Sequence, residues 1–99
     1  MDRRRLLVRF AAGPTWSDGG SPRDQAGWDE HAAFVDGLVA DGTLVMGGPL
    51  SDHTGALMLF EGVTEPQARE LLATDPFVEN GVFVLAEILE WTIFADSVR

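Results

Sequence analysis

The sequence contains no cysteine, and only seven of its 99 residues are basic against sixteen that are acidic. Without cysteine the chain forms no disulfide and has no thiolate for catalysis or zinc binding. The net charge of −9 repels nucleic-acid phosphates and anionic membrane surfaces, so neither is an expected partner. Apolar runs stay well short of the roughly 20 residues that span a bilayer. The arginines at 3–5 lead into a short strand-like run rather than a secretory signal, so we expect a cytoplasmic protein.

The composition is that of a globular protein, because 45% of the residues are hydrophobic. We expect one domain over residues 1–99. Runs of branched and aromatic residues predict strands, and apolar residues at helical spacing predict two helices, the second capped by Thr64 with Gln67 three residues later. A Gly/Pro-rich segment at 13–27 is a predicted loop. The expected strands are 4–11, 43–50, 56–61 and 82–93; the first helix begins at Trp28 and stops at Asp41-Gly42, and the second lies within 64–75.

The element order β-α-β-β-α-β is typical of the ferredoxin-like α+β fold, a four-stranded antiparallel sheet with both helices on one face. The last strand alternates two apolar sets, so the face without helices is expected to be apolar. A soluble monomer rarely exposes such a patch, and we therefore predict a homodimer that packs two sheets face to face. The predicted sets are Phe83, Leu85, Leu89 and Trp91 on one face, and Val82, Val84, Ala86 and Ile88 on the other.

Two ionisable residues are predicted to point inward at the same edge of this sheet. His31 shares the helical stripe of Trp28 and Val35, and Asp75 continues the stripe of Leu71 on the second helix. A carboxylate that accepts one ring N–H fixes the imidazole tautomer and leaves the other nitrogen free to take a proton. We therefore predict a catalytic His31–Asp75 pair that performs acid–base chemistry.

Each member of this pair also has a simpler explanation. Asp75 precedes Pro76, so its side chain can cap a short helical turn. His31 can be a partly buried residue satisfied by a backbone carbonyl or by Asp29 or Glu30. Two inward polar groups at one edge favour the pair over two independent coincidences.

The predicted pocket draws on loop and aromatic residues near the same edge. Trp16, Trp28 and Phe77 can line it, although aromatic residues at such spacings also suit a core. Gly48 and Pro49 end a strand where another group can approach closely. His53 lies in the hairpin 51–55, where it is either a turn residue or part of the pocket rim. No His-x₃₋₅-His spacing is present, so we expect no metal and no other cofactor.

The run "HAAFVDGLVADGTLVMGGP" at 31–49 and the run "ATDPFVENGVFVLAEILEW" at 73–91 resemble the YciI-like, YCII-related proteins. The shared features are a helix-borne histidine, a strand that ends in glycine and proline, and Asp-Pro-Phe before a valine-rich strand. The resemblance implies a ferredoxin-like fold of the dimeric α+β barrel type that dimerises through its sheets. It also implies a suspected active site at His31 and Asp75, and one relative is a dehydrochlorinase that acts on a chlorinated hydroxyhydroquinone. The 13–27 loop departs from the family pattern, so the family predicts neither the pocket entrance nor the substrate class.

Three functional hypotheses follow from the sequence. The first is a cofactor-independent enzyme of lyase, dehydrochlorinase or isomerase type, in which His31 and Asp75 move a proton on a small aromatic or enolisable molecule. The second is a module that binds a small molecule in the same cleft without turning it over. The third is a dimeric interaction domain whose polar edge is incidental.

Overall fold

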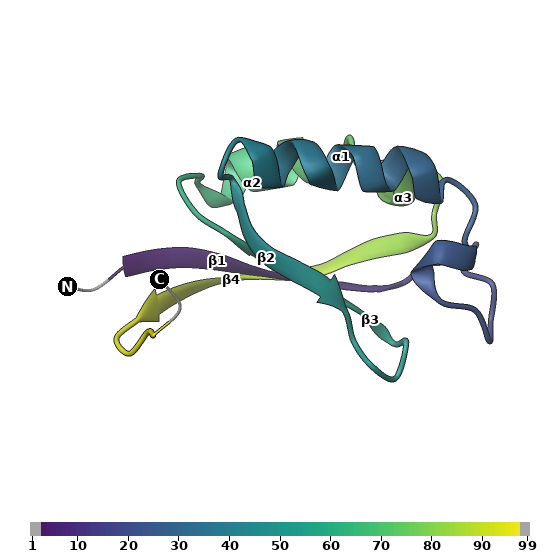
Figure 1. Ribbon diagram of the computed structural model, residues 1–99, viewed down its shortest axis with the longest axis horizontal. Coiled ribbons are helices and arrows are strands. Elements are labelled where there is room, and N and C mark those ends of the chain that lie inside the picture. Colours follow the sequence, from purple (N-terminus) through teal and green to yellow (C-terminus); the bar gives the residue numbers. More distant parts are fainter. Residues whose placement is uncertain (1–2, 98–99) are drawn as a thin grey trace.

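The computed structural model describes residues 3–97 and has the expected α+β architecture. Its four strands form one antiparallel sheet in the order β2-β3-β1-β4, and the α-helices cover one face of it (Figure 1). This confirms the predicted ferredoxin-like fold. The elements are β1 (Arg3–Ala12), the 3₁₀ helix η1 (Pro22–Asp24), α1 (Trp28–Ala40), β2 (Leu44–Pro49), β3 (Gly55–Phe60), α2 (Glu65–Leu72), α3 (Pro76–Glu79) and β4 (Phe83–Ile93).

The core lies between the helices and the sheet. On the sheet side of the core, Val8, Phe10 and Phe60 are fully buried. On the helix side, Leu72 of α2 is buried to nearly the same extent. Helix α2 begins with the predicted capping box: the Gln67 backbone N–H donates to Thr64 Oγ1 at 3.3 Å, and the Thr64 N–H donates to Gln67 Oε1 at 2.9 Å. None of the helices within 3–97 is both long enough and apolar enough to cross a bilayer.

The helix η1 was not among the predicted elements, whereas α3 is the short turn capped by Asp75 that the simpler explanation of this residue described. η1 lies within the long 13–27 segment, and α3 follows α2 after a break at 73–75. The break arises because Asp75 takes an extended backbone conformation, φ −63° and ψ 125°, and Pro76 then opens a new turn. The chain therefore changes direction where the second predicted helix was expected to end.

The predicted division of β4 into two apolar faces is wrong. Its register against β1 shifts at Ala86, which has no partner and forms a bulge. Because one extra residue exchanges the two faces of a strand, Ile88 faces the helices. Leu89 and Trp91 instead share the opposite face with Val84, and these three side chains are between 45% and 49% exposed. The sheet face away from the helices thus carries exposed apolar side chains, as expected, but different ones, and the exposed Arg9–Glu87 ion pair lies between Val84 and Leu89 on this face.

Candidate functional site

His31 lies in the first turn of α1 and is 7% exposed. The helix begins after Gly27, whose φ of 85° is readily adopted only by glycine. A side chain at Gly27 would also approach Asn80, since a Cβ there would lie 2.7 Å from Asn80 Nδ2. This glycine lets the loop pass close to α3, and α1 can then direct His31 toward the end of the sheet.

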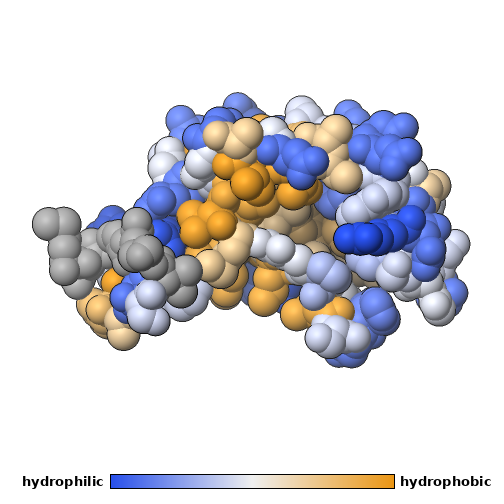
Figure 2. Space-filling model, in the orientation of Figure 1, coloured by the Kyte–Doolittle hydropathy of each residue, from blue (hydrophilic) through white to orange (hydrophobic). Residues whose placement is uncertain are grey.

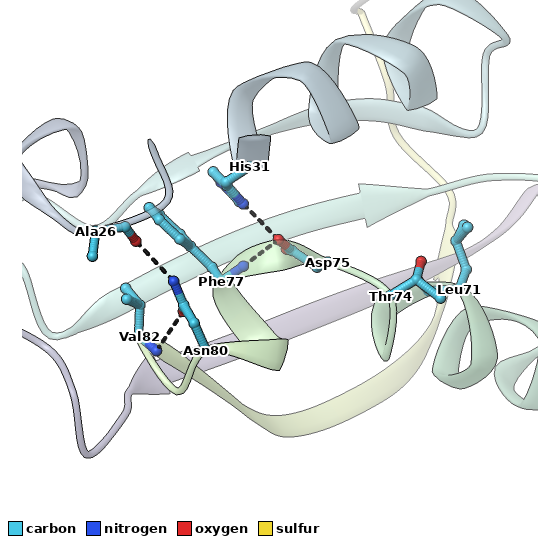
Figure 3. A network of polar contacts seen from close by, with 8 residues as sticks. All are labelled: Ala26, His31, Leu71, Thr74, Asp75, Phe77, Asn80 and Val82. Atoms are coloured by element: carbon cyan, nitrogen blue, oxygen red, sulfur yellow. Dashed lines mark hydrogen bonds and ion pairs between the residues drawn. The ribbon is translucent and has the colours of Figure 1, made fainter. Parts of the chain in front are cut away.

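Asp75 is completely buried, and one of its oxygens makes two contacts. Oδ1 accepts a hydrogen bond from the Phe77 backbone N–H at 2.9 Å, which caps α3. The same Oδ1 lies 2.8 Å from His31 Nδ1 (Figure 3). Capping and contact with the histidine are therefore not alternatives, because one atom does both.

The geometry assigns opposite tasks to the two ring nitrogens of His31. Opposite an ionised Asp75, which can only accept, the contact is satisfied by the tautomer of His31 whose Nδ1–H donates to Oδ1. In this neutral tautomer the lone pair lies on Nε2, and the hydrogen bond of the His31 side chain within residues 3–97 is made through Nδ1. The arrangement leaves a proton acceptor available on a ring whose orientation is fixed.

Aromatic side chains hold the His31 ring. Phe77 stacks on it with a centroid distance of 4.0 Å and an interplanar angle of 8°. Phe83 meets the ring edge-on at 5.9 Å, and Trp28 lies tilted at 5.8 Å. These contacts leave the imidazole little freedom to rotate away from Asp75.

The second oxygen of Asp75, Oδ2, is buried and has no hydrogen-bond partner among residues 3–97. Leaving a buried polar atom unpaired costs about 1–3 kcal/mol. Such a group contributes less to stability than a fully paired one, so its presence beside a histidine favours a role in binding or chemistry over a purely structural one.

A cavity of about 530 Å³ opens beside His31, between α1 and the β2–β3 side of the sheet. This volume lies within the usual range for sites that bind small molecules. Trp28 and Val35 form part of its helical wall, Met58 and Phe83 part of its sheet wall. In the space-filling view the surface is hollowed beneath the helix layer, with hydrophobic residues on one side of the hollow and hydrophilic residues on the other (Figure 2).

A family model of the YCII-related domain matches residues 9–92. The chain belongs to this family. Over 63 residues it is 38% identical to the uncharacterized protein YjpA of Bacillus subtilis (strain 168), a match that covers 64% of this chain and 73% of YjpA. Among solved structures it resembles 5-chloro-2-hydroxyhydroquinone dehydrochlorinase (TftG) from Burkholderia phenoliruptrix AC1100, in complex with 2,5-dihydroxybenzoquinone. The TM-score is 0.64 at 20% identity, over 87% of this chain and 92% of TftG, which shows a shared fold.

In this YCII-related protein, four of the six predicted binding residues line the cavity. They are Trp28, Gly48, Pro49 and His53. The other two lie outside its wall: Trp16 stacks on Phe83 at 6.0 Å, and Phe77 is fully buried. Within the described residues, no group of three or more His, Asp or Glu side chains is arranged to hold a metal ion.

The part of the cavity wall that η1 and its N-cap supply was not predicted from the sequence. Ser21, Pro22 and Arg23 lie along it. A signal was present in "SPRD", because serine followed by proline, with an acidic residue three positions after the serine, is typical of a helix start. The Asp24 carboxylate accepts from the Ser21 backbone N–H at 3.0 Å, as that pattern predicts.

Proposed function

We propose that this YCII-related protein is a small cofactor-independent enzyme that transfers protons on a planar, enolisable or aromatic molecule. His31 is the general base, and Asp75 positions it. The observation that carries the proposal is the 2.8 Å separation of His31 Nδ1 and Asp75 Oδ1 at the wall of a 530 Å³ cavity. The fold shared with a dehydrochlorinase agrees with a lyase or isomerase step.

In such a step, Nε2 of His31 takes a proton from a carbon or hydroxyl of the bound molecule. The electron pair left behind forms a new double bond. In an isomerisation, the imidazolium returns its proton to another atom. In an elimination from an aromatic chloride, the imidazolium first returns its proton to the ring carbon that bears chlorine, which gives a keto tautomer. Removal of a second hydroxyl proton then forms a new double bond as chloride departs with the C–Cl bonding pair. The Asp75 carboxylate stabilises the imidazolium that exists between the two halves of the step.

The test measures proton transfer directly. Two probes serve: exchange of the ring hydrogens of 2,5-dihydroxybenzoquinone for deuterium, followed by NMR, and chloride release from 5-chloro-2-hydroxyhydroquinone. We expect His31→Ala and Asp75→Asn each to lower the rate roughly 10²- to 10⁴-fold, the usual contribution of a positioned base. The control is Asp41→Asn, which removes an exposed carboxylate beyond the other end of α1. Unchanged exchange and chloride release in both His31→Ala and Asp75→Asn would refute the mechanism.

A second candidate is a binding module, favoured by the apolar character of the cavity wall and the small number of polar groups within it. In this case 2,5-dihydroxybenzoquinone binds, and its ring hydrogens exchange no faster than in buffer. Binding is then reduced in His31→Ala because a hydrogen-bond partner is lost.

We also propose that two copies of the chain pack through the sheet face away from the helices. Support comes from Val84, Leu89 and Trp91, which together present apolar side chains about half exposed on that face. Apolar side chains exposed together on one sheet face are typical of a self-complementary interface, and the exposed Arg9–Glu87 ion pair between Val84 and Leu89 would lie within it. Size-exclusion chromatography with light scattering distinguishes the dimer from a monomer of 10.7 kDa.

A further inference from the structure

Arg23 is a cation at the rim of the cavity. It lies on η1, and its guanidinium carbon is 5.8 Å from the centre of the Trp28 ring, within the range of a cation–π contact. Both side chains line the cavity. Arg23 forms no ion pair with any carboxylate of residues 3–97, so its charge is available to a ligand.

The segment that carries Arg23 is held in place by side-chain hydrogen bonds. Gln25, 5% exposed, accepts from the Ser17 N–H at 2.7 Å and donates to the carbonyl oxygens of Ser17 and Ser21, both at 3.2 Å. Asn80 Nδ2 donates to the Ala26 carbonyl at 2.9 Å, which joins the segment to the end of α3 (Figure 3). The arginine is therefore presented by an ordered turn rather than by a loose loop, which lowers the entropic cost of binding.

Charge is unevenly distributed around the cavity. Arg23 and His31 lie near the start of α1, whereas Asp36 lies eight residues after Trp28. The eight residues from Trp28, which contacts Arg23, to Asp36 span about 12 Å of α-helix, so the Arg23 end of the cavity is separated from Asp36. An elongated ligand can place a negative group at Arg23 and keep it away from Asp36.

We infer that Arg23 determines substrate specificity by binding an anionic oxygen, a carboxylate or an ionised hydroxyl, on a small planar ring. The ring lies against Trp28 and the apolar wall of the sheet, next to His31. This inference rests on the proposed function for its choice of cavity. At this position Arg23 supplies the local positive charge needed to bind an anion that the overall field of a protein of net charge −9 repels.

The experiment compares benzoate with benzamide, which have nearly the same shape and differ in charge. Binding is measured by titration calorimetry at low salt on the wild type, Arg23→Met and Arg69→Met. Methionine keeps an unbranched apolar stem without the charge. Arg69 lies on α2, where it pairs with Glu65 at 3.0 Å, so its loss changes the net charge equally but does not touch the cavity.

We expect the wild type to bind benzoate roughly tenfold more tightly than benzamide, a modest value because Arg23 is exposed and screened. Arg23→Met removes this preference and leaves benzamide binding unchanged, Arg69→Met retains it, and Arg23→Lys retains part of it. The inference is overturned if Arg23→Met keeps the preference, if both methionine variants lose it equally, or if benzoate does not bind the wild type.

The result is separable from that of the proton-transfer test. If His31→Ala leaves ring-hydrogen exchange and chloride release unchanged while the benzoate preference still depends on Arg23, the proposed chemistry fails and the anion site stands. If catalysis depends on His31 but the benzoate preference does not depend on Arg23, the anion site fails and the proposed chemistry stands.

Discussion

Replacing Asp75 separates the electrostatic role of its carboxylate from its structural role. In Asp75→Asn the amide oxygen can still accept from the Phe77 N–H and from His31 Nδ1–H, because the side chain keeps its shape. The amide nitrogen replaces Oδ2, the atom that has no partner. We therefore expect the free energy of unfolding to change by less than about 1 kcal/mol, since one unpaired buried polar group replaces another. A neutral amide stabilises imidazolium poorly, so proton transfer falls although the fold persists.

Asp75→Ala gives the corresponding estimate for complete removal. Loss of the helix cap costs about 1 kcal/mol. Loss of the charge-assisted bond to His31 costs about 1.5–3 kcal/mol, and removal of the unpaired buried Oδ2 offsets about 1–3 kcal/mol of that. The expected net destabilisation is roughly 1 kcal/mol, similar to that of Thr64→Ala, which removes only the cap of α2.

Urea denaturation followed by tryptophan fluorescence measures these differences, and the exchange assay measures chemistry on the same samples. Thr64→Ala is the matched control, because it loses a cap and keeps the His31–Asp75 contact. A destabilisation above about 4 kcal/mol in Asp75→Ala would show that the buried pair is mainly structural and would contradict the expected value of roughly 1 kcal/mol. Full activity in Asp75→Asn would refute the electrostatic role.

Three further outcomes are expected. Trp91→Glu places a charge on the open sheet face, so light scattering should give the monomer mass while circular dichroism stays unchanged. Gln25→Ala releases the turn that carries Arg23, and calorimetry should show a smaller benzoate preference with the same benzamide affinity. Hydrogen bonds from Thr54 lower the pKa of Asp52 below its ordinary value of 3.8. The stability that this contact gives the 51–55 hairpin is present above pH 3.8 and is lost as the pH falls through the lowered pKa of Asp52. Thr54→Val should therefore raise the pKa of Asp52 measured by NMR titration.

The fold could be predicted from the sequence because its determinants are local. Periodic apolar residues and the Thr64 cap define the strands and helices, and the element order leaves few topologies. The bulge at Ala86 could not be predicted, since alternation within one strand contains no information about register against its neighbour. The faces of Leu89 and Trp91 therefore had to be read from the pairing of β1 with β4.

The candidate site, like the fold, could be predicted only in part from the sequence. The inward direction of His31 and Asp75 follows from helical spacing, but their separation depends on a contact across 44 residues of sequence. Arg23 was missed because a single 3₁₀ turn has too few residues to show a period. Trp16 and Phe77 illustrate the opposite difficulty: an aromatic side chain near a pocket can lie behind its wall, and only packing decides which occurs.

The shared oxygen of Asp75 has a consequence for how this site can change over evolutionary time. A descendant that no longer needed proton transfer would still need the cap of α3, so selection for folding alone would retain the aspartate. His31 has no comparable structural role, because another flat side chain could pack against Phe77 in its place. Among relatives of this chain, the histidine rather than the aspartate should therefore distinguish active members from those that have kept only the fold.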